Sequence, residues 1–189
     1  MVLAAGGGRR YGGPKALVRH EDGRLLVERA VATLRDGGCT RIWVVLGAES
    51  GRVRDEARLA GVELLDNPTW KSGMGSSLRV GLAALAELAE TDAQAVAVLL
   101  VDTPGIGPEA VARLLAAASG GSGALLTATY KGRRGHPVIL GRDHWPGVTT
   151  LATADVGARA YLIAHAADVQ GVPCEDIADD TDLDVPPEG

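Results

Sequence analysis

A glycine cluster followed by cationic side chains stands near the start of the chain. Residues 6–8 are all glycine, directly after the apolar residues 2–5, and Arg10 and Lys15 follow within a few positions. Glycines let backbone N–H groups turn toward an anion without a clash from a Cβ atom. Arginine and lysine add the charged hydrogen bonds that phosphate oxygens accept. The set predicts a polyphosphate site, whereas the glycines alone are as typical of a simple turn.

Spacing excludes the two most familiar phosphate-binding glycine loops. Counted from Gly6 and Gly8, the dinucleotide fingerprint needs its third glycine where this chain has Tyr11. The phosphate loop of NTPases ends in glycine, lysine and serine or threonine, but here Pro14 precedes Lys15 and alanine follows it. A phosphate ligand in this loop would therefore be bound by a protein outside those two classes.

An acidic residue follows the most apolar strand-like segment. Residues 95–101 are entirely apolar and end at Asp102, whose carboxylate needs solvent, a cation or a metal at such a place. The tail offers a partner in Asp184, with Asp182 as the alternative. Magnesium beside phosphates typically uses one or two carboxylates. We therefore expect a Mg²⁺ site, while a loop role for Asp102 and a merely solvated tail remain open.

Strand-like and helix-like segments alternate along the chain. The apolar patterns predict helices at 25–34, 51–60, 78–88, 108–118 and 157–166, and strands at 2–5, 41–46, 62–65, 95–101, 124–130, 136–140 and 169–172. We expect Ser76 and Ser77 to cap the helix at 78–88. Because Met1 directly precedes the first strand, we also expect either that the native chain begins upstream or that the sheet tolerates a very short central strand.

This alternation predicts the fold class. Wholly apolar strands belong in a parallel sheet covered by helices on both faces, so we expect a three-layer α/β/α fold with a mostly parallel sheet. Residues 124–140 add a β-hairpin, and no linker divides the single domain expected over residues 1–189. Ligands of such sheets bind beyond the carboxyl ends of the strands. The glycine loop and Asp102 should meet there.

Composition narrows the partners and the location. The net charge of -5, without a basic run, argues against nucleic-acid and anionic-membrane partners, which need a positive face. No apolar segment approaches the length of a membrane span and no signal sequence is evident, so we expect a cytoplasmic protein. Cys39 and Cys174 lie far apart without metal-ligand spacing, which leaves their role open.

Taken together, the motifs resemble a nucleotidyltransferase family related to the molybdenum cofactor cytidylyl- and guanylyltransferases. The resemblance spans nearly the whole chain, in the family's order, and its five motifs are Leu3-Ala4-Ala5-Gly6-x-Gly8-x-Arg10-x-Gly12-x-x-Lys15, Asn67-Pro68-x-Trp70-x-x-Gly73-Met74-x-x-Ser77-Leu78, Val101-Asp102-x-Pro104, Arg134-Gly135-His136-Pro137 and Asp155-x-Gly157-Ala158-Arg159. The tail is similar to a family Asp-x-Asp-Thr-Pro ending, with Val185 in place of threonine. Tyr11 stands where the family often has methionine.

The resemblance implies a Rossmann-like, GT-A-like fold and roles for particular residues. Arg10 and Lys15 would hold the β and γ phosphates, and Asp102 with Asp184 would hold magnesium at the α phosphate; Arg10, Lys15 and Asp102 are thereby the expected catalytic residues. The remaining expected nucleotide-binding residues surround the base and the loop, and are Leu3, Ala4, Ala5, Gly6, Gly8, Asn67 and Ser77.

Four residues are weaker candidates for the acceptor site. Trp70 would cover a heterocycle or cap the core, and His136 suits turn or acceptor-site packing better than proton transfer. Asp155 and Arg159 face the acceptor or pair locally. Asn67 likewise bonds a ligand or only shapes its Asn-Pro turn. The sequence leaves these pairs of interpretations open.

The leading hypothesis is an enzyme that joins CMP from CTP to the phosphate of molybdopterin and releases pyrophosphate. GTP is the rival donor. The choice of CTP rests on Ala4-Ala5 before Gly6, because this form resembles the cytidylyl members of the family. Another small phosphorylated acceptor is the enzymatic alternative. A binding protein that delivers a nucleotide or cofactor without turnover is the alternative from another class, and a molybdoenzyme or its maturation factor is the expected protein partner.

Overall fold

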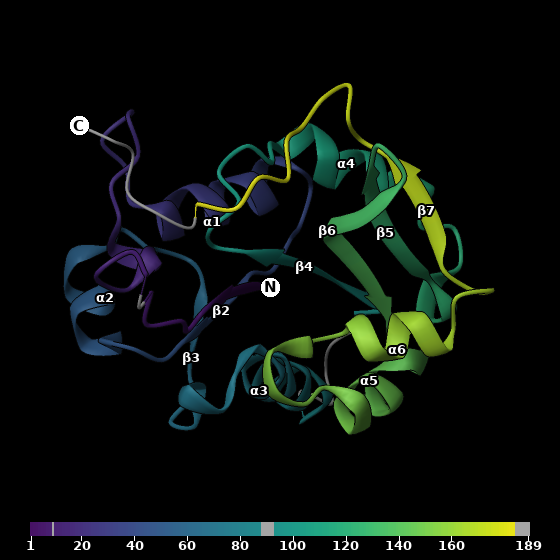
Figure 1. Ribbon diagram of the computed structural model, residues 1–189, viewed down its shortest axis with the longest axis horizontal. Helices are drawn as coiled ribbons and strands as arrows, with labels where there is room; N and C mark the ends of the chain where they lie inside the picture. The colour runs from purple at the N-terminus through teal and green to yellow at the C-terminus, as the bar shows by residue number, and fades with distance from the viewer. Residues whose placement is uncertain (9, 88–92, 184–189) are drawn as a thin grey trace.

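The computed structural model describes residues 1–8, 10–87 and 93–183, and within them one seven-stranded sheet forms the middle layer (Figure 1). Its order is β3-β2-β1-β4-β6-β5-β7. The strands are β1 Val2–Ala4, β2 Trp43–Leu46, β3 Glu63–Asp66, β4 Ala95–Leu100, β5 Leu125–Tyr130, β6 Arg133–Gly141 and β7 Gln170–Pro173. β6 is antiparallel to both neighbours, and the other neighbouring pairs are parallel. The predicted mostly parallel sheet is confirmed, with the return strand of the hairpin inserted beside β4.

Helices cover both faces of this sheet, as Figure 1 shows. One face packs against α1 Leu26–Asp36, α2 Ser50–Glu56 and α4 Pro108–Ala117, and the other against α3 Met74–Glu87, α5 Trp145–Leu151 and α6 Arg159–Ala164. Val2 and Ala4 of β1 join the first core, whereas Leu3 joins the second, because successive side chains of a strand point to opposite faces. These two cores confirm the predicted three-layer α/β/α architecture.

The strand order fixes where a ligand site can form. From β1 the chain winds outward through β2 to β3 and then returns to β4 on the other side of β1. The carboxyl ends of β1 and β4 therefore flank the point where the strand order reverses, which is where ligands of open α/β sheets bind. β1 ends at the glycine loop and β4 ends just before Asp102, so the fold brings the two together.

Helix α3 starts earlier than the sequence predicts. It begins at Met74, so Ser76 and Ser77 lie in its first turns, and the predicted cap before residue 78 is wrong. The Ser76 hydroxyl donates instead to the carbonyl of Gly73 at 2.8 Å, and both serine hydroxyls accept from the Asn67 amide. The predicted helix end at residue 88 lies outside the described residues. Helix α5 was not predicted.

The chain returns to the sheet edge after β7. Residues 174–183, which we call the C-terminal strap, run back past β5 toward the loop that follows β4 (Figure 1). Ile177, Ala178 and Leu183 pack against the first core. Among the described residues, no helix is long and apolar enough to cross a membrane.

Candidate active site

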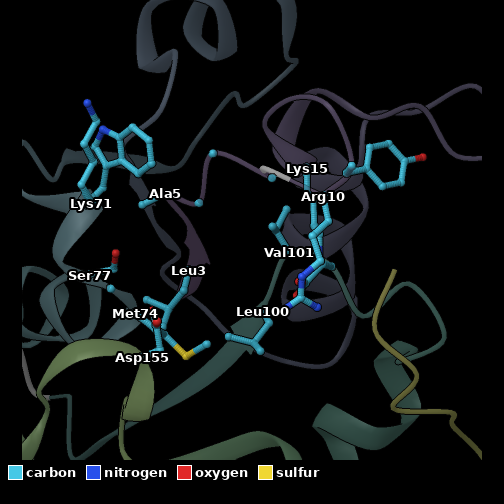
Figure 2. Close-up of a pocket in the computed structure, with 17 residues that line it drawn as sticks. Leu3, Ala5, Arg10, Lys15, Lys71, Met74, Ser77, Leu100, Val101 and Asp155 are labelled. Atoms are coloured by element: carbon cyan, nitrogen blue, oxygen red, sulfur yellow. The ribbon is translucent and has the colours of Figure 1, made fainter. Parts of the chain in front are cut away.

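A cavity of about 390 Å³ opens where the ends of β1 and β4 meet (Figure 2). Its walls come from four places: the glycine loop, the end of β4, the start of α3 and the turn at Asp155. The lining residues predicted from the sequence are Leu3, Ala5, Gly6, Gly8, Arg10, Lys15, Trp70, Ser77, Asp102 and Asp155. The fold thus gathers residues from far apart in the chain into one site.

The glycine loop closes on its own backbone. The carbonyl of Gly8 accepts hydrogen bonds from the amides of Tyr11 and Gly12, each at 2.9 Å, and from Gly13 at 3.3 Å. Gly8 has φ of +54°, and a Cβ atom on it would lie 1.9 Å from the carbonyl oxygen of Gly13. Only glycine fits this position. The tight turn brings Arg10 and Lys15 back to the same cavity.

Lys15 and Asp102 form an ion pair at the cavity wall. The Lys15 ammonium donates to the Asp102 carboxylate at 2.7 Å, and their side chains are only 15% and 23% exposed. Lys15 opens a short 3₁₀ turn, Lys15–Leu17, directly after Pro14. The partial burial strengthens this electrostatic contact relative to a pair in open solvent. Two groups suited to phosphate and to metal are therefore held against each other.

The opposite end of the cavity is lined by Trp70 and Lys71. A Cβ atom on Gly7 would come within 2.9 Å of the Trp70 ring, and one on Gly47 would come within 2.6 Å of Trp70 and 2.8 Å of the Ala5 methyl. The Lys71 ammonium lies over the Trp70 ring, 5.6 Å from its centroid. Figure 2 shows Lys71 across the cavity from Arg10 and Lys15, and Trp70, the residue before Lys71, lines the same cavity. The close approach of the Gly7 and Gly47 backbone therefore leaves the Trp70 ring little room to move at this end.

Asn67 supports the site from behind. It is buried and is absent from the residues that line the cavity. Its amide donates to the hydroxyls of Ser76 at 2.8 Å and Ser77 at 3.0 Å, while its carbonyl oxygen accepts from the backbone and hydroxyl of Thr69. These bonds fix the loop before α3. Of the two, only Ser77 reaches the cavity wall.

A second cavity, of about 540 Å³, lies between β6 and α6. Its polar lining consists mainly of Arg133, Arg134, His136 and Arg159. Arg134 donates to the carbonyl of Leu162 at 3.0 Å, near the carboxyl end of α6. Burial lowers the pKa of His136 to about 4, although Asp102 and Asp180 act to raise it, so its imidazole is neutral at pH 7. The second cavity thus presents cations beside a neutral ring.

A single turn stands between the two cavities. The 3₁₀ turn Ala154–Val156 carries Asp155 into the wall of the first cavity and Val156 into the wall of the second, where Arg159 also lies. The predicted acceptor residues are therefore divided: Trp70 and Asp155 line the first cavity, whereas His136 and Arg159 line the second.

The strap approaches the acid of the first cavity. The backbone N–H of Leu183 donates to the Asp102 carbonyl at 2.9 Å, which brings the neighbouring Asp182 to this loop. Asp184 lies outside the described residues. Within the described residues, no group of three or more acidic, histidine or cysteine side chains is arranged as a metal site. Asp155 lines the same cavity as Asp102, and the strap reaches the Asp102 loop through the backbone of Leu183.

Sequence reasoning missed Lys71 in the first cavity and the arginines that make the second cavity basic. Lys71 lies inside the motif that begins at Asn67, and Arg134 lies inside the motif around His136, but neither was singled out. A charged residue within a motif was the available signal. Arg133 carried no signal, because only the fold places it beside α6.

Comparison with known proteins supplies the family. The chain is 38% identical over 192 residues to the nicotine blue oxidoreductase of Paenarthrobacter nicotinovorans, covering 97% of this chain and 90% of that protein. The structure of an Rv0371c homologue from Mycobacterium sp. strain JC1 is 28% identical, with a TM-score of 0.75, over 97% of this chain and 88% of that one. Rv0371c from Mycobacterium tuberculosis in complex with manganese has the same fold, with a TM-score of 0.71 and 24% identity over 91% of this chain and 85% of that one.

The family model described as the MobA-like NTP transferase domain matches residues 1–169. That match spans the glycine loop, Asp102, both cavities and nearly the whole sheet. It confirms the resemblance seen in the motifs and the expectation of a nucleotidyltransferase enzyme. The chain belongs to the MobA-like NTP transferase family.

Proposed function

We propose that the protein transfers CMP from CTP to the phosphate of molybdopterin and releases pyrophosphate. One observation carries this proposal: the Lys15–Asp102 pair, 2.7 Å apart, lies beside the glycine loop in a cavity that the Trp70 ring also lines. A triphosphate needs cations and amides at one end of its site, and a base needs a flat wall at the other. The first cavity offers both.

In this proposal each group of the first cavity has one task. Arg10 and Lys15 bind the β and γ phosphates, with the amides of Gly6 and Gly8. The backbone of residues 3–6 faces the base, and Ser77, held by Asn67, contacts the nucleoside. Lys15 exchanges its bond to Asp102 for bonds to phosphate when the nucleotide binds. The role of the protein is to orient two anions and neutralise their charge.

The residues present fit a magnesium ion or a similar divalent cation. Asp102 and Asp184 would supply hard carboxylate oxygens, with the strap residue Asp182 as the alternative to Asp184. Magnesium beside a triphosphate needs only one or two such carboxylates, because phosphates and waters complete its shell. When bound, the ion would supply positive charge against the α phosphate and the departing pyrophosphate.

The second cavity is the proposed place of the acceptor. A phosphate monoester is already ionised at neutral pH, since its second pKa is about 6, so the attacking oxygen needs no strong general base. Arg159 would bind the acceptor anion, and neutral His136 would offer a hydrogen bond. Asp155 would contact the acceptor from the first cavity, whereas Trp70, an acceptor candidate from the sequence, is assigned here to the base. A molybdoenzyme or its maturation factor would take the product.

A redox reaction is the second candidate, because the relative with 38% identity is a nicotine blue oxidoreductase. The flat wall formed by Trp70, with Met74 and Leu100 nearby, would also suit a planar heteroaromatic substrate. The remaining alternatives are GTP as the donor, another small phosphorylated acceptor, and a delivery protein without turnover.

A nucleotide panel separates these functions. The protein is incubated with magnesium, molybdenum-loaded molybdopterin and CTP, GTP, ATP or UTP in turn, and pyrophosphate release is measured. Fastest release with CTP supports the proposal, and fastest release with GTP replaces the donor. Tight nucleotide binding without pyrophosphate indicates a delivery protein. In a separate incubation with nicotine blue and a reduced nicotinamide dinucleotide as hydride donor, reduction of nicotine blue with matching oxidation of the donor, and no pyrophosphate from any nucleotide in the panel, would establish the redox alternative.

A further inference from the structure

The C-terminal strap is attached to the same loop that carries Asp102. The backbone N–H of Asp179 donates to the carbonyl of Gly105 at 3.1 Å, and that of Leu183 donates to the carbonyl of Asp102 at 2.9 Å. Asp182 lies between these two attachments. The position of its carboxylate relative to Asp102 therefore depends on how the strap lies on this loop.

Two glycines leave room for the strap. A Cβ atom on Gly105 would lie 2.6 Å from the backbone oxygen of Asp179, and one on Gly135 would lie 2.7 Å from Oδ2 of Asp180. Neither glycine has a φ angle in the left-handed region that L side chains avoid. Clearance for the strap therefore requires glycine at position 105, whereas at position 135 the strap and the Tyr130 ring, 2.9 Å away, together take the space of a side chain.

An ion pair fixes the strap between these glycines. The side chain of Asp180 is only 12% exposed, and its Oδ1 accepts from Arg133 at 3.0 Å, whereas Arg133 itself is 71% exposed. A mostly buried carboxylate is costly without a partner, so the loss of Arg133 would favour a strap position in which Asp180 reaches water.

We propose that Gly105, Gly135 and the Arg133–Asp180 pair are positioning residues, which hold the strap so that Asp182 stands beside Asp102 and thereby set the affinity for a divalent cation. None of them touches the reacting atoms. The inference rests on the proposed metal-dependent function, but it concerns the strap and can be measured without turnover. Removal of residues that orient metal ligands typically lowers metal affinity about 10–100-fold.

Two readouts test the proposal in the full chain. Hydrogen exchange of the Leu183 amide reports the bond to Asp102, and Mn²⁺ binding in the presence of CTP, followed by electron paramagnetic resonance, reports the cation site. In Gly105→Ala and Arg133→Ala we expect Leu183 to exchange faster and the Kd for Mn²⁺ to rise by about tenfold. The two substitutions disturb the strap in different ways, so either one remains informative if the other fails to fold.

Matched controls exclude a general loss of stability. Gly107→Ala changes a glycine of the same loop, where a Cβ atom would meet only the flexible carboxylate of Glu109, at 2.6 Å. Arg54→Ala breaks an exposed ion pair of similar length, 2.9 Å to Asp66, away from the strap. Both should leave the Leu183 exchange rate and the Mn²⁺ affinity unchanged.

The outcomes are separable from those of the proposed function. Faster Leu183 exchange with unchanged Mn²⁺ affinity would overturn the inference, as would an unprotected Leu183 amide in the unmodified protein. If both readouts change as expected but no nucleotide yields pyrophosphate, the strap positions the cation site and the proposed transfer reaction is wrong.

Discussion

The two cavities differ in how their charges are held. In the first, Lys15 and Asp102 are paired with each other and partly buried, so each can exchange its partner for a phosphate or a cation. In the second, Arg134 donates to backbone and Arg133 to the strap, while Val156 and Ile163, 40% and 62% exposed, give it apolar edges. We interpret the first as a site for a triphosphate and the second as a site for an anion with an apolar body.

Asp102→Asn should have the largest effect, and it should disable cation binding in the first cavity without affecting the second. A neutral amide binds a cation poorly beside charged phosphates, and one lost electrostatic contribution of this kind costs about 10²–10³ in kcat. Circular dichroism should show an unchanged fold, and acceptor binding should be unaffected. Turnover close to that of the unmodified protein would contradict the role of Asp102.

Lys15→Ala separates the contribution of the phosphate end of the first cavity from that of the base end. A hydrogen bond to a charged group is worth about 1.5–3 kcal/mol, so we expect the Kd for CTP to rise by about ten- to a hundredfold. Cytidine, which has no phosphates, should bind as before, and isothermal titration calorimetry measures both. An equal loss for CTP and cytidine would exclude a phosphate-specific role for Lys15.

Arg159→Ala tests the second cavity by itself. We expect the KM for the acceptor to rise by about tenfold with the KM for CTP unchanged, because one charged hydrogen bond to the acceptor is lost. Arg35→Ala is the matched control. Arg35 lies on helix α1 and donates a hydrogen bond to the carbonyl of Ala60, so this variant also loses an arginine, but away from the second cavity. A change in the KM for CTP alone would place Arg159 in the nucleotide site instead.

His136 gives the second cavity a signature in acid. Its pKa of about 4 in the folded protein is below the ordinary value of 6.5, so the unfolded chain binds a proton first and stability falls as the pH drops from 6.5 to 4. His136 lines the cavity, so solvent reduces the energetic cost of its charge. Between pH 6.5 and pH 4 we therefore expect the free energy of unfolding of His136→Gln to fall by about 1–2 kcal/mol less than that of the unmodified protein. Urea unfolding at both pH values measures this; equal losses would show that His136 titrates normally.

Ala5→Gly should have the smallest effect and concerns the base alone. The Ala5 methyl contacts the Gly47 region beside Trp70, so its removal gives the base end of the first cavity more room. Steric discrimination by one small group is worth about 1–3 kcal/mol, which permits a preference of about tenfold to a few hundredfold. We expect the ratio of kcat/KM for CTP over GTP to narrow several-fold. An unchanged ratio would remove Ala5 from base selection.

The same comparison explains how far the sequence could predict the structure. The parallel part of the sheet, formed by β3, β2, β1 and β4, could be predicted from local sequence. Apolar strands, glycine breaks and an acid directly after a strand are all patterns of neighbouring residues. The predicted start of α3 was wrong. The buried Asn67, which precedes the helix, donates hydrogen bonds to the hydroxyls of both Ser76 and Ser77, so these hydroxyls do not cap the helix. A tertiary contact overrode the capping preference of serine.

The second cavity depends on contacts that no local pattern contains. The insertion of β6 between β4 and β5, and the return of the strap to Asp102, join segments far apart in the chain. Motifs pointed to His136 and Arg159, but their separation from Asp155 and Trp70 by a single turn is a property of the fold. Nor did the sequence reveal that Gly105 and Gly135 make room for the strap.

The most direct test follows the phosphorus atoms of one reaction. The unmodified protein is incubated with CTP, magnesium and molybdenum-loaded molybdopterin, and ³¹P nuclear magnetic resonance is recorded over time. The account predicts pyrophosphate and a new pyrophosphate-linked dinucleotide in equal amounts, with both formed about 10²–10³ times more slowly by Asp102→Asn. Loss of CTP without the dinucleotide, or no pyrophosphate from any nucleoside triphosphate, would contradict the proposal that the two cavities hold a nucleotide donor and a phosphate acceptor.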